Sequence, residues 1–142
     1  MNFVLDASAT LSWLLSDAKA ANRQYAAGLL ESLKQGATAV VPVIWALEVA
    51  NVLARGEAAD KVTQAQTVAF VEMLDGVSVH VDAASVSQAL GDTLDLARRY
   101  QLSSYDASYL EVALRLTLPL ATLDDRLRKA AHKAGVKRFQ PA

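Results

Sequence analysis

The sequence predicts an α/β fold, with a parallel β-sheet flanked by helices on both faces in three layers. Short apolar runs rich in β-branched residues alternate with longer segments of helical periodicity. Parallel neighbouring strands need crossover connections, and the intervening helices supply them. No repeat, low-complexity tract or Pro/Gly-rich linker interrupts the chain. We therefore expect one domain that spans residues 1–142.

The first half of the chain predicts two strands and two helices. A short apolar run ends at Asp6, and the helical spacing that follows it stops at Gly36. Pro42 is expected in the first turn of the second helix, which runs to about Arg55 and stops at Gly56. The predicted elements are a strand at 2–5, a helix at 18–35, a strand at 38–41 and a helix at 42–55.

The second half repeats the alternation. Asp60 is a candidate cap for a helix that ends at Gly76. The elements predicted after it are a strand at 77–81, helices at 85–100 and 106–116, a buried strand at 118–122, a helix at 124–134 and a last short strand at 136–139.

Composition restricts the classes of site that the chain can form. There is no cysteine and there are only two histidines, so thiolate sites and histidine-based zinc sites are excluded. Any bound metal must be held by oxygen, which favours Mg²⁺ or Mn²⁺. The N-terminus has no leader-like pattern, and no apolar stretch approaches the ~20 residues of a membrane span. We expect a soluble, cytoplasmic protein without a membrane partner.

The charge of the chain is balanced overall but unevenly distributed. The net charge of −1 argues against strong nonspecific binding to nucleic acid. Residues 126–142 contain no acid and six cations, and this region is either a solvated last helix that complements its dipole or an edge that contacts phosphate. The six cations are Arg126, Arg128, Lys129, Lys133, Lys137 and Arg138.

Acidic residues follow two predicted strands. Asp6 closes the first strand and Asp124 follows the strand at 118–122, so both should reach the same edge of the sheet. Helix capping is the alternative for each of them. Asp106 precedes another helix and is also a candidate cap, but Ser103 and Ser104 compete for that position.

Glu48 lies in the middle of an apolar helix, where a capping role is impossible. Helical spacing places it on one stripe with Trp45 and Asn51. The alternative is a surface glutamate that pairs with Arg55. Trp45 and Tyr105 flank the acids and are candidates for stacking on a nucleobase, although burial of both rings is the simpler expectation.

Several carboxylates at one sheet edge repel one another and raise each other's pKa unless a divalent cation neutralises them. The predicted arrangement therefore implies a metal. Metals held by carboxylates are well suited to phosphodiester hydrolysis, in which they activate water and stabilise the leaving oxygen.

The order of four short motifs resembles the PIN-domain family, and within it the VapC-type ribonuclease toxins of bacterial toxin–antitoxin pairs. Leu5-Asp6-Ala7-Ser8 is similar to the opening D-x-S of that family, and Leu47-Glu48-Val49-Ala50-Asn51 is similar to its E-V-x-N helix. Ser104-Tyr105-Asp106-Ala107 resembles its Y-D-A segment, and Ala121-Thr122-Leu123-Asp124 resembles its closing T-x-D. Together these motifs span Asp6 to Asp124.

The resemblance implies an endoribonuclease that cleaves single-stranded or structured RNA by a metal-activated water and leaves a 5′-phosphate and a 3′-hydroxyl. It also implies Mg²⁺ or Mn²⁺, a homodimer, which the apolar content of 53% also favours, and a cognate antitoxin. The catalytic and metal-binding acids would be Asp6, Glu48, Asp106 and Asp124, supported by Ser8, Asn51 and Thr122. Asp125 competes with Asp124, but a helix that begins here directs it about 100° away.

Rival classes fit the pattern less well. A haloacid-dehalogenase-like phosphatase needs a second acid two residues after Asp6, where this chain has Ser8. A response-regulator receiver needs an acidic pair at the first strand and an acceptor aspartate near the middle of the chain. A PIN-like domain that only binds a partner is disfavoured because all four acids are present.

Overall fold

The computed structural model describes residues 1–141, and Ala142, the last residue of the predicted single domain, lies outside the described residues. A single parallel sheet of four strands lies at its centre, in the order β3-β2-β1-β4. The strands are β1 (Asn2–Leu5), β2 (Thr38–Pro42), β3 (Val79–Asp82) and β4 (Leu120–Ala121). The predicted α/β class with a parallel sheet is confirmed.

The order of the strands creates a switch point beside β1. The chain builds outward from β1 to β2 and β3, and then returns to place β4 on the opposite side of β1. Val4 is paired with Leu120 on one side and with Val40 on the other. In such sheets, ligands bind in the crevice outside the carboxyl ends of the strands where the order reverses. That crevice lies between the ends of β1 and β4.

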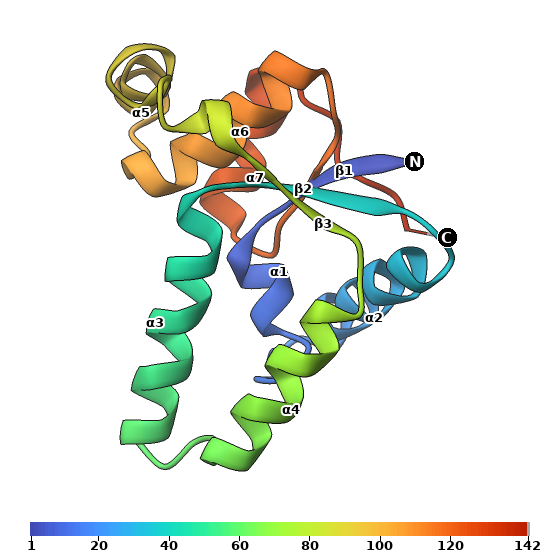
Figure 1. Cartoon of the computed structure of the whole chain (residues 1–142). Helices are drawn as coiled ribbons and strands as arrows, with labels where there is room; N and C mark the ends of the chain where they lie inside the picture. The colour runs from blue at the N-terminus through green and yellow to red at the C-terminus, as the bar shows by residue number, and fades with distance from the viewer. Residues whose placement is uncertain (142) are drawn as a thin grey trace.

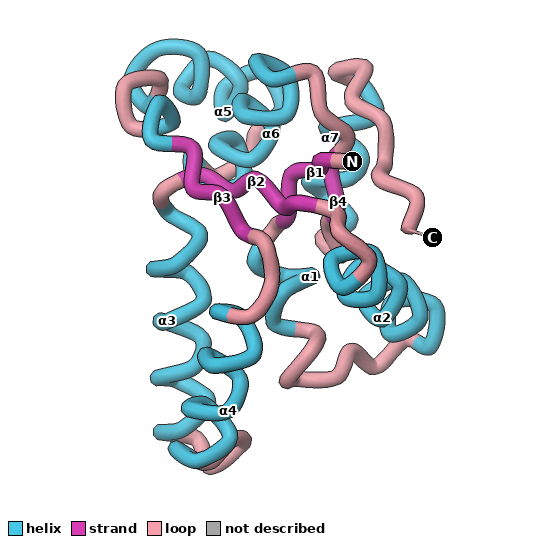
Figure 2. Tube along the Cα trace, turned by 45° about the vertical axis from the view of Figure 1, so that its right-hand side comes forward, coloured by secondary structure: helices cyan, strands magenta, loops and turns pink. Residues whose placement is uncertain are grey.

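Helices cover both faces of the sheet (Figures 1 and 2), with α5 and α6 on one side and α1, α2 and α4 on the other. α6 contacts β1, β2 and β4. α3 begins directly after β2 and runs away from the sheet beside α4 (Figure 1). The helices are α1 (Ala7–Leu11), α2 (Ala20–Lys34), α3 (Ile44–Ala58), α4 (Gln64–Asp75), α5 (Leu94–Tyr100), α6 (Ser104–Leu116) and α7 (Asp125–Lys133). No helix within residues 1–141 is both long and apolar enough to cross a membrane.

The expected boundaries around α3 are wrong in three places. Pro42 ends β2 instead of opening the helix, and this is tolerated because the pairing of β2 with β1 stops at Val40. Gly56 lies inside α3, where a Cβ would come within 2.9 Å of Val62 Cγ1, so the glycine permits close packing and does not end the helix. Asp60 was expected to cap the next helix, but it lies in the loop after α3 with a left-handed φ of 57°.

The remaining boundaries differ for local reasons. Thr63, not Asp60, caps α4, through a reciprocal capping box with Gln66. The helix predicted at 85–100 is irregular in its first half, which contains the end of the short turn η1 (Ala83–Ser85) and the short helical segment η2 (Ala89–Thr93). Gly91 inside η2 has non-helical angles (φ −112°, ψ −106°), and the regular helix α5 begins only at Leu94. The last predicted strand is reduced to one bridge between Leu120 and Arg138. The short helix α1 was not predicted.

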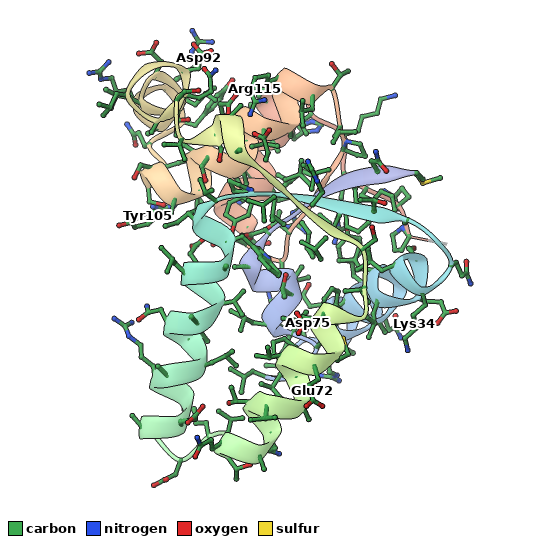
Figure 3. All side chains as sticks on the ribbon, viewed as in Figure 1. Lys34, Glu72, Asp75, Asp92, Tyr105 and Arg115 are labelled. Carbon is green, nitrogen blue, oxygen red and sulfur yellow. The ribbon has the colours of Figure 1, made fainter. Side chains whose placement is uncertain are left out.

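A buried ion network holds the end of β3 against α6. Arg115 Nε donates to Glu111 Oε2 at 2.7 Å, and the Arg115 guanidinium also binds the Asp82 carboxylate. The side chain of Glu111 is 3% exposed and that of Asp82 is 14% exposed. The two carboxylates raise the pKa of Arg115. The network fixes the turn that follows β3, at the top of the view in Figure 3.

Candidate functional site

Asp6 occupies the crevice at the end of β1 and is almost fully buried, at 3% exposure. Its Oδ2 atom accepts two hydrogen bonds, from Ser8 Oγ at 2.7 Å and from Thr122 Oγ1 at 2.6 Å. Although Asp6 immediately precedes α1, its side chain makes no capping hydrogen bond. The capping alternative for Asp6 is therefore wrong.

The turn after β4 orients both hydroxyl groups. The Leu123 N–H donates to Ser8 Oγ at 3.1 Å, and the Asp124 N–H donates to Thr122 Oγ1 at 3.0 Å. A hydroxyl that accepts from a backbone N–H is left with its own proton to donate. Both protons are therefore directed at the Asp6 carboxylate, which is fixed by segments from opposite ends of the chain.

Glu48 is half-buried on α3 and accepts a hydrogen bond from the Tyr109 hydroxyl, at 2.6 Å from Oε1. The expected alternative, an ion pair with Arg55, does not form among the described residues. Burial and the neighbouring Asp6 charge raise the pKa of Tyr109, which keeps its hydroxyl protonated as a donor. Tyr109 thus holds Glu48 toward α6.

The two acids at helix starts have different local roles. Ser103 caps α6 by accepting from the Asp106 N–H at 3.1 Å, which leaves the Asp106 carboxylate free of capping, as expected. Asp124 does cap α7, because its Oδ1 accepts from the Leu127 N–H at 2.9 Å. Asp125 is exposed and pairs with Arg128 at 2.7 Å. The charge of Asp124, and not that of Asp125, raises the pKa values of Asp6 and Asp106, so Asp124 is the one associated with the other acids.

The four carboxylates act on one another electrostatically. Burial, followed by the charges of Asp6, Asp124 and Glu48, raises the pKa of Asp106 from 3.8 to about 6. Burial and the Asp124 charge raise the pKa of Asp6 against the opposing hydroxyl hydrogen bonds. Burial, opposed by the Tyr109 hydrogen bond and assisted by the Asp6 charge, raises the pKa of Glu48. Within residues 1–141, none of the four forms an ion pair. The acids therefore lie near enough for the charges of Asp6, Asp124 and Glu48 to raise the pKa of Asp106, with no described cation paired to any of the four.

The donor set fits a hard divalent cation. The crevice presents carboxylate and hydroxyl oxygens, which are the ligands of Mg²⁺ and Mn²⁺. Among the described residues, no group of three or more acidic or histidine side chains is already close enough to hold an ion directly. Repulsion between the carboxylates favours a wide separation of their side chains. Mg²⁺ keeps several of its waters when bound and needs only one or two carboxylates as direct ligands.

Three of the residues considered from the sequence lie outside this network. Asn51 is exposed, and its side chain makes no hydrogen bond in the described part of the chain. Trp45 is buried, as expected, and its Nε1 donates to Thr10 Oγ1 at 3.0 Å. Tyr105 is 56% exposed and points away from the sheet (Figure 3), so the expectation of burial for this ring is wrong.

Two residues that hold the site in place were missed from the sequence. Tyr109 is fully buried and lies one turn after Asp106 on α6. Thr10 Oγ1 donates to the Asp6 carbonyl at 3.1 Å and so ties the end of β1 to the Trp45 ring. The sequence did contain a signal for Tyr109, because it lies three residues after Asp106 on the same predicted helix. A buried tyrosine hydroxyl there needs a polar partner.

Comparison with known proteins identifies the class of fold and of domain. The family model of the PIN domain matches residues 3–133, which is most of the chain. The structure resembles the crystal structure of PAE2754 from Pyrobaculum aerophilum, with a TM-score of 0.64 and 22% sequence identity over 92% of this chain and 87% of that chain. Among curated proteins, no sequence matches this one.

Proposed function

Since the chain belongs to the PIN domain family, we propose that it is a metal-dependent endoribonuclease whose ion is held by Asp6, Glu48, Asp106 and Asp124. PIN domains are typically nucleases, and these nucleases generally use divalent metals such as Mg²⁺. The observation that carries the proposal is that the charges of Asp6, Asp124 and Glu48 raise the pKa of Asp106, while none of the four carboxylates forms an ion pair with a described residue. Such a set is electrostatically unfavourable unless a cation is bound.

The residues of the crevice have separate tasks in this proposal. Ser8 and Thr122 hold the Asp6 carboxylate in one orientation, and Tyr109 does the same for Glu48. Fixed carboxylates lose little conformational freedom when they bind an ion or orient an attacking water. When bound, Mg²⁺ or Mn²⁺ supplies positive charge to the scissile phosphate and lowers the pKa of a water.

Cleavage of a mixed RNA pool tests the proposal directly. We expect cleavage with Mg²⁺ or Mn²⁺ and none with a chelator, and the Asp106→Asn variant should lose it. Asp125→Asn is the matched control, because Asp125 is exposed and pairs only with Arg128. If wild-type protein leaves RNA intact under every metal condition, or if Asp106→Asn cuts as fast as Asp125→Asn, the proposal is wrong.

We extend the proposal to the partners: the nuclease is the toxin of a toxin–antitoxin pair, a homodimer that is blocked by a cognate antitoxin. The support is an apolar exposed surface along α3 and α4. Leu47 is 68% exposed and Val43 is 40% exposed. Beside them, a groove of 390 Å³ between α3, α4 and β3 is lined by Val71 and Val81 among others. Apolar patches of this kind mark interaction surfaces.

The partner proposal has its own test. Light scattering at micromolar concentration should give the mass of two chains, and induced expression should arrest growth unless the active-site variant Asp106→Asn is expressed. A monomer would remove the dimer. Normal growth with an active nuclease in the cell would remove the toxin role.

Loss of one supporting hydroxyl should weaken metal binding without unfolding the protein. Thr122→Val keeps the side-chain shape but removes the donor to Asp6 Oδ2, so the pKa of Asp6 should rise further. We expect Mn²⁺ affinity to fall by about 10- to 100-fold, measured by calorimetry at pH 7. Thr38→Val on β2 is the control, because Thr38 contacts only Ser78 through its hydroxyl. Equal affinities in the two variants would contradict the role of Thr122.

The raised pKa of Asp106 predicts a pH-dependent response to metal. Because its folded pKa of about 6 exceeds 3.8, the folded state binds this proton more tightly than the unfolded state. The contribution of Asp106 to stability is therefore complete below about pH 3.8 and lost as the pH rises through about 6. In chelator, the Tm of Asp106→Asn should exceed that of wild type increasingly as the pH rises.

Added Mn²⁺ should reverse this loss. We expect the rise in the Tm of wild-type protein on addition of Mn²⁺ to be larger at pH 7.5 than at pH 5, measured by calorimetry, because protonated carboxyls do not bind the ion. A Tm rise of the same size at both pH values would show that Asp106 does not take part in binding.

A further inference from the structure

A second surface feature lies next to the acids and has no role so far. A groove of 860 Å³ runs between α7 and the segment 135–140, and we name it the α7 groove. Its lining contains six basic or imidazole side chains and no acid. These are Arg128, Lys129, His132, Lys133, Lys137 and Arg138.

We propose that the α7 groove binds the phosphate backbone of a single RNA strand and leads it to the acidic crevice. The identity of the polyanion rests on the proposed nuclease function. The groove itself is defined by its own residues, so binding and cleavage can be measured separately.

Three of the lysines are available to a ligand. Lys129, Lys133 and Lys137 are exposed and form no ion pair with any described residue. Two other cations are already engaged, since Arg128 pairs with Asp125 and the Arg138 guanidinium lies 3.9 Å from the centre of the Tyr25 ring. In a chain with a net charge of −1, this is a local concentration of uncompensated positive charge.

The lysines are placed along a channel and not scattered over a surface. Lys129 and Lys133 are four residues apart on α7, so they share one helix face. Lys137 comes from the opposite wall, where the segment after α7 bridges to β4 through Arg138 and Leu120. A strand that follows the groove would meet cations from both walls, as successive phosphates require.

The groove borders the acidic crevice at Thr122. Thr122 lines the groove, and its hydroxyl donates to Asp6 Oδ2 at 2.6 Å. A polyanion on its own is repelled by four carboxylates, so it needs favourable contacts beside them. The α7 groove supplies these contacts close to the acids, because Thr122 both lines the groove and hydrogen bonds to Asp6.

The lining also indicates how the strand is recognised. Leu120, Ala131 and Val136 give an apolar floor, and no Trp, Tyr or Phe lines the groove. Recognition without aromatic stacking platforms depends on backbone charge and not on base identity. We therefore expect binding here to be salt-dependent and tolerant of sequence.

The test is the binding of a fluorescently labelled single-stranded RNA of about 12 nucleotides, measured by anisotropy in chelator so that cleavage cannot interfere. Lys133→Gln/Lys137→Gln is compared with Arg55→Gln/Lys61→Gln. The second variant removes two exposed cations, at and just after the end of α3, that form no ion pair with a described residue. For the groove variant, the slope of log affinity against log salt should fall by about 1.4 and affinity at low salt by roughly tenfold or more. The control should match wild type, and equal Tm values would show that both variants are folded.

The outcomes separate this proposal from the nuclease function. If the groove variant and the control have the same affinity and salt slope, the α7 groove proposal is overturned even when wild-type protein cleaves RNA. If the slope depends on Lys133 and Lys137 but no metal supports cleavage, the groove proposal stands and the nuclease proposal fails. If a polyglutamate peptide of equal charge displaces the RNA at the same concentration as unlabelled RNA, the groove is a site for acidic polypeptide and the proposal is overturned.

Discussion

Replacing Asp6 with Asn should abolish metal-dependent RNA cleavage, by at least two orders of magnitude, while the protein stays folded. Loss of a group that only supports a metal ligand already costs about 10- to 100-fold, and Asp6 is proposed as a ligand itself. Asparagine keeps one oxygen that can accept from Ser8 and Thr122, so the hydrogen bonds at this position survive. The measurement is the rate of cleavage of labelled RNA with Mn²⁺.

Stability distinguishes loss of an ionised ligand from loss of the fold. Because burial and Asp124 oppose ionisation of Asp6, removing its charge should leave the Tm in chelator equal to or higher than that of wild type. Asp92→Asn is the charge-matched control, since Asp92 lies at the far top of the molecule in Figure 3. Full metal-dependent activity in Asp6→Asn would refute the role assigned to Asp6, and a lower Tm would show that Asp6 is needed for structure.

Replacing Arg115 with Met should destabilise the protein by about 3 kcal/mol, measured by urea unfolding at pH 7. The substitution leaves the Glu111 and Asp82 carboxylates buried without a counter-charge. Removing one partner leaves a buried charge unpaired and strongly lowers the free energy of unfolding. Replacing the whole buried pair with apolar residues changes that free energy far less. The loss should therefore be partly restored by the double variant Glu111→Met/Arg115→Met, which removes one of the stranded charges.

Arg98→Met is the matched control for this prediction. Arg98 pairs with Asp95 on α5, but the two side chains are 68% and 69% exposed, and exposed pairs contribute about 0 to 1 kcal/mol. Similar losses in the two variants would show that the Arg115 network contributes no more than a surface ion pair. Destabilisation of Arg115→Met that is unchanged in the double variant would show that the stranded Glu111 charge is not its cause.

The sequence predicted the parallel α/β class and the position of Asp6 and Asp124 at the ends of strands because both depend on local pattern and simple geometry. Apolar runs located β1 and β2 within a residue or two. Asp6 and Asp124 follow strands that run parallel, so they had to emerge at one edge of the sheet. Glu48 was conspicuous because a charge in the middle of an apolar helix needs a polar partner, which is the Tyr109 hydroxyl.

The errors arose where contacts between distant segments decide the outcome. Gly56 resembles a helix stop until Val62 is seen to pack against it. Asn51 shares a helical stripe with Glu48, but it is one turn further from the sheet and remains exposed. The strand expected at 118–122 is reduced to Leu120–Ala121, although the backbone bonds of Leu120 to Lys137 and Phe139 continue the edge. Sequence periodicity does not predict which distant segments of the chain come into contact.

The position of β4 has a consequence for synthesis of the protein. Asp6 and Thr122 hydrogen bond across 116 residues of chain, and Asp124 lies beyond Thr122. A nascent chain that is still emerging from the ribosome therefore exposes its first acid long before the last can join it. Unfinished polypeptides lack the hydroxyl donor and the fourth carboxylate, so translation must pass residue 124 before the crevice exists at all.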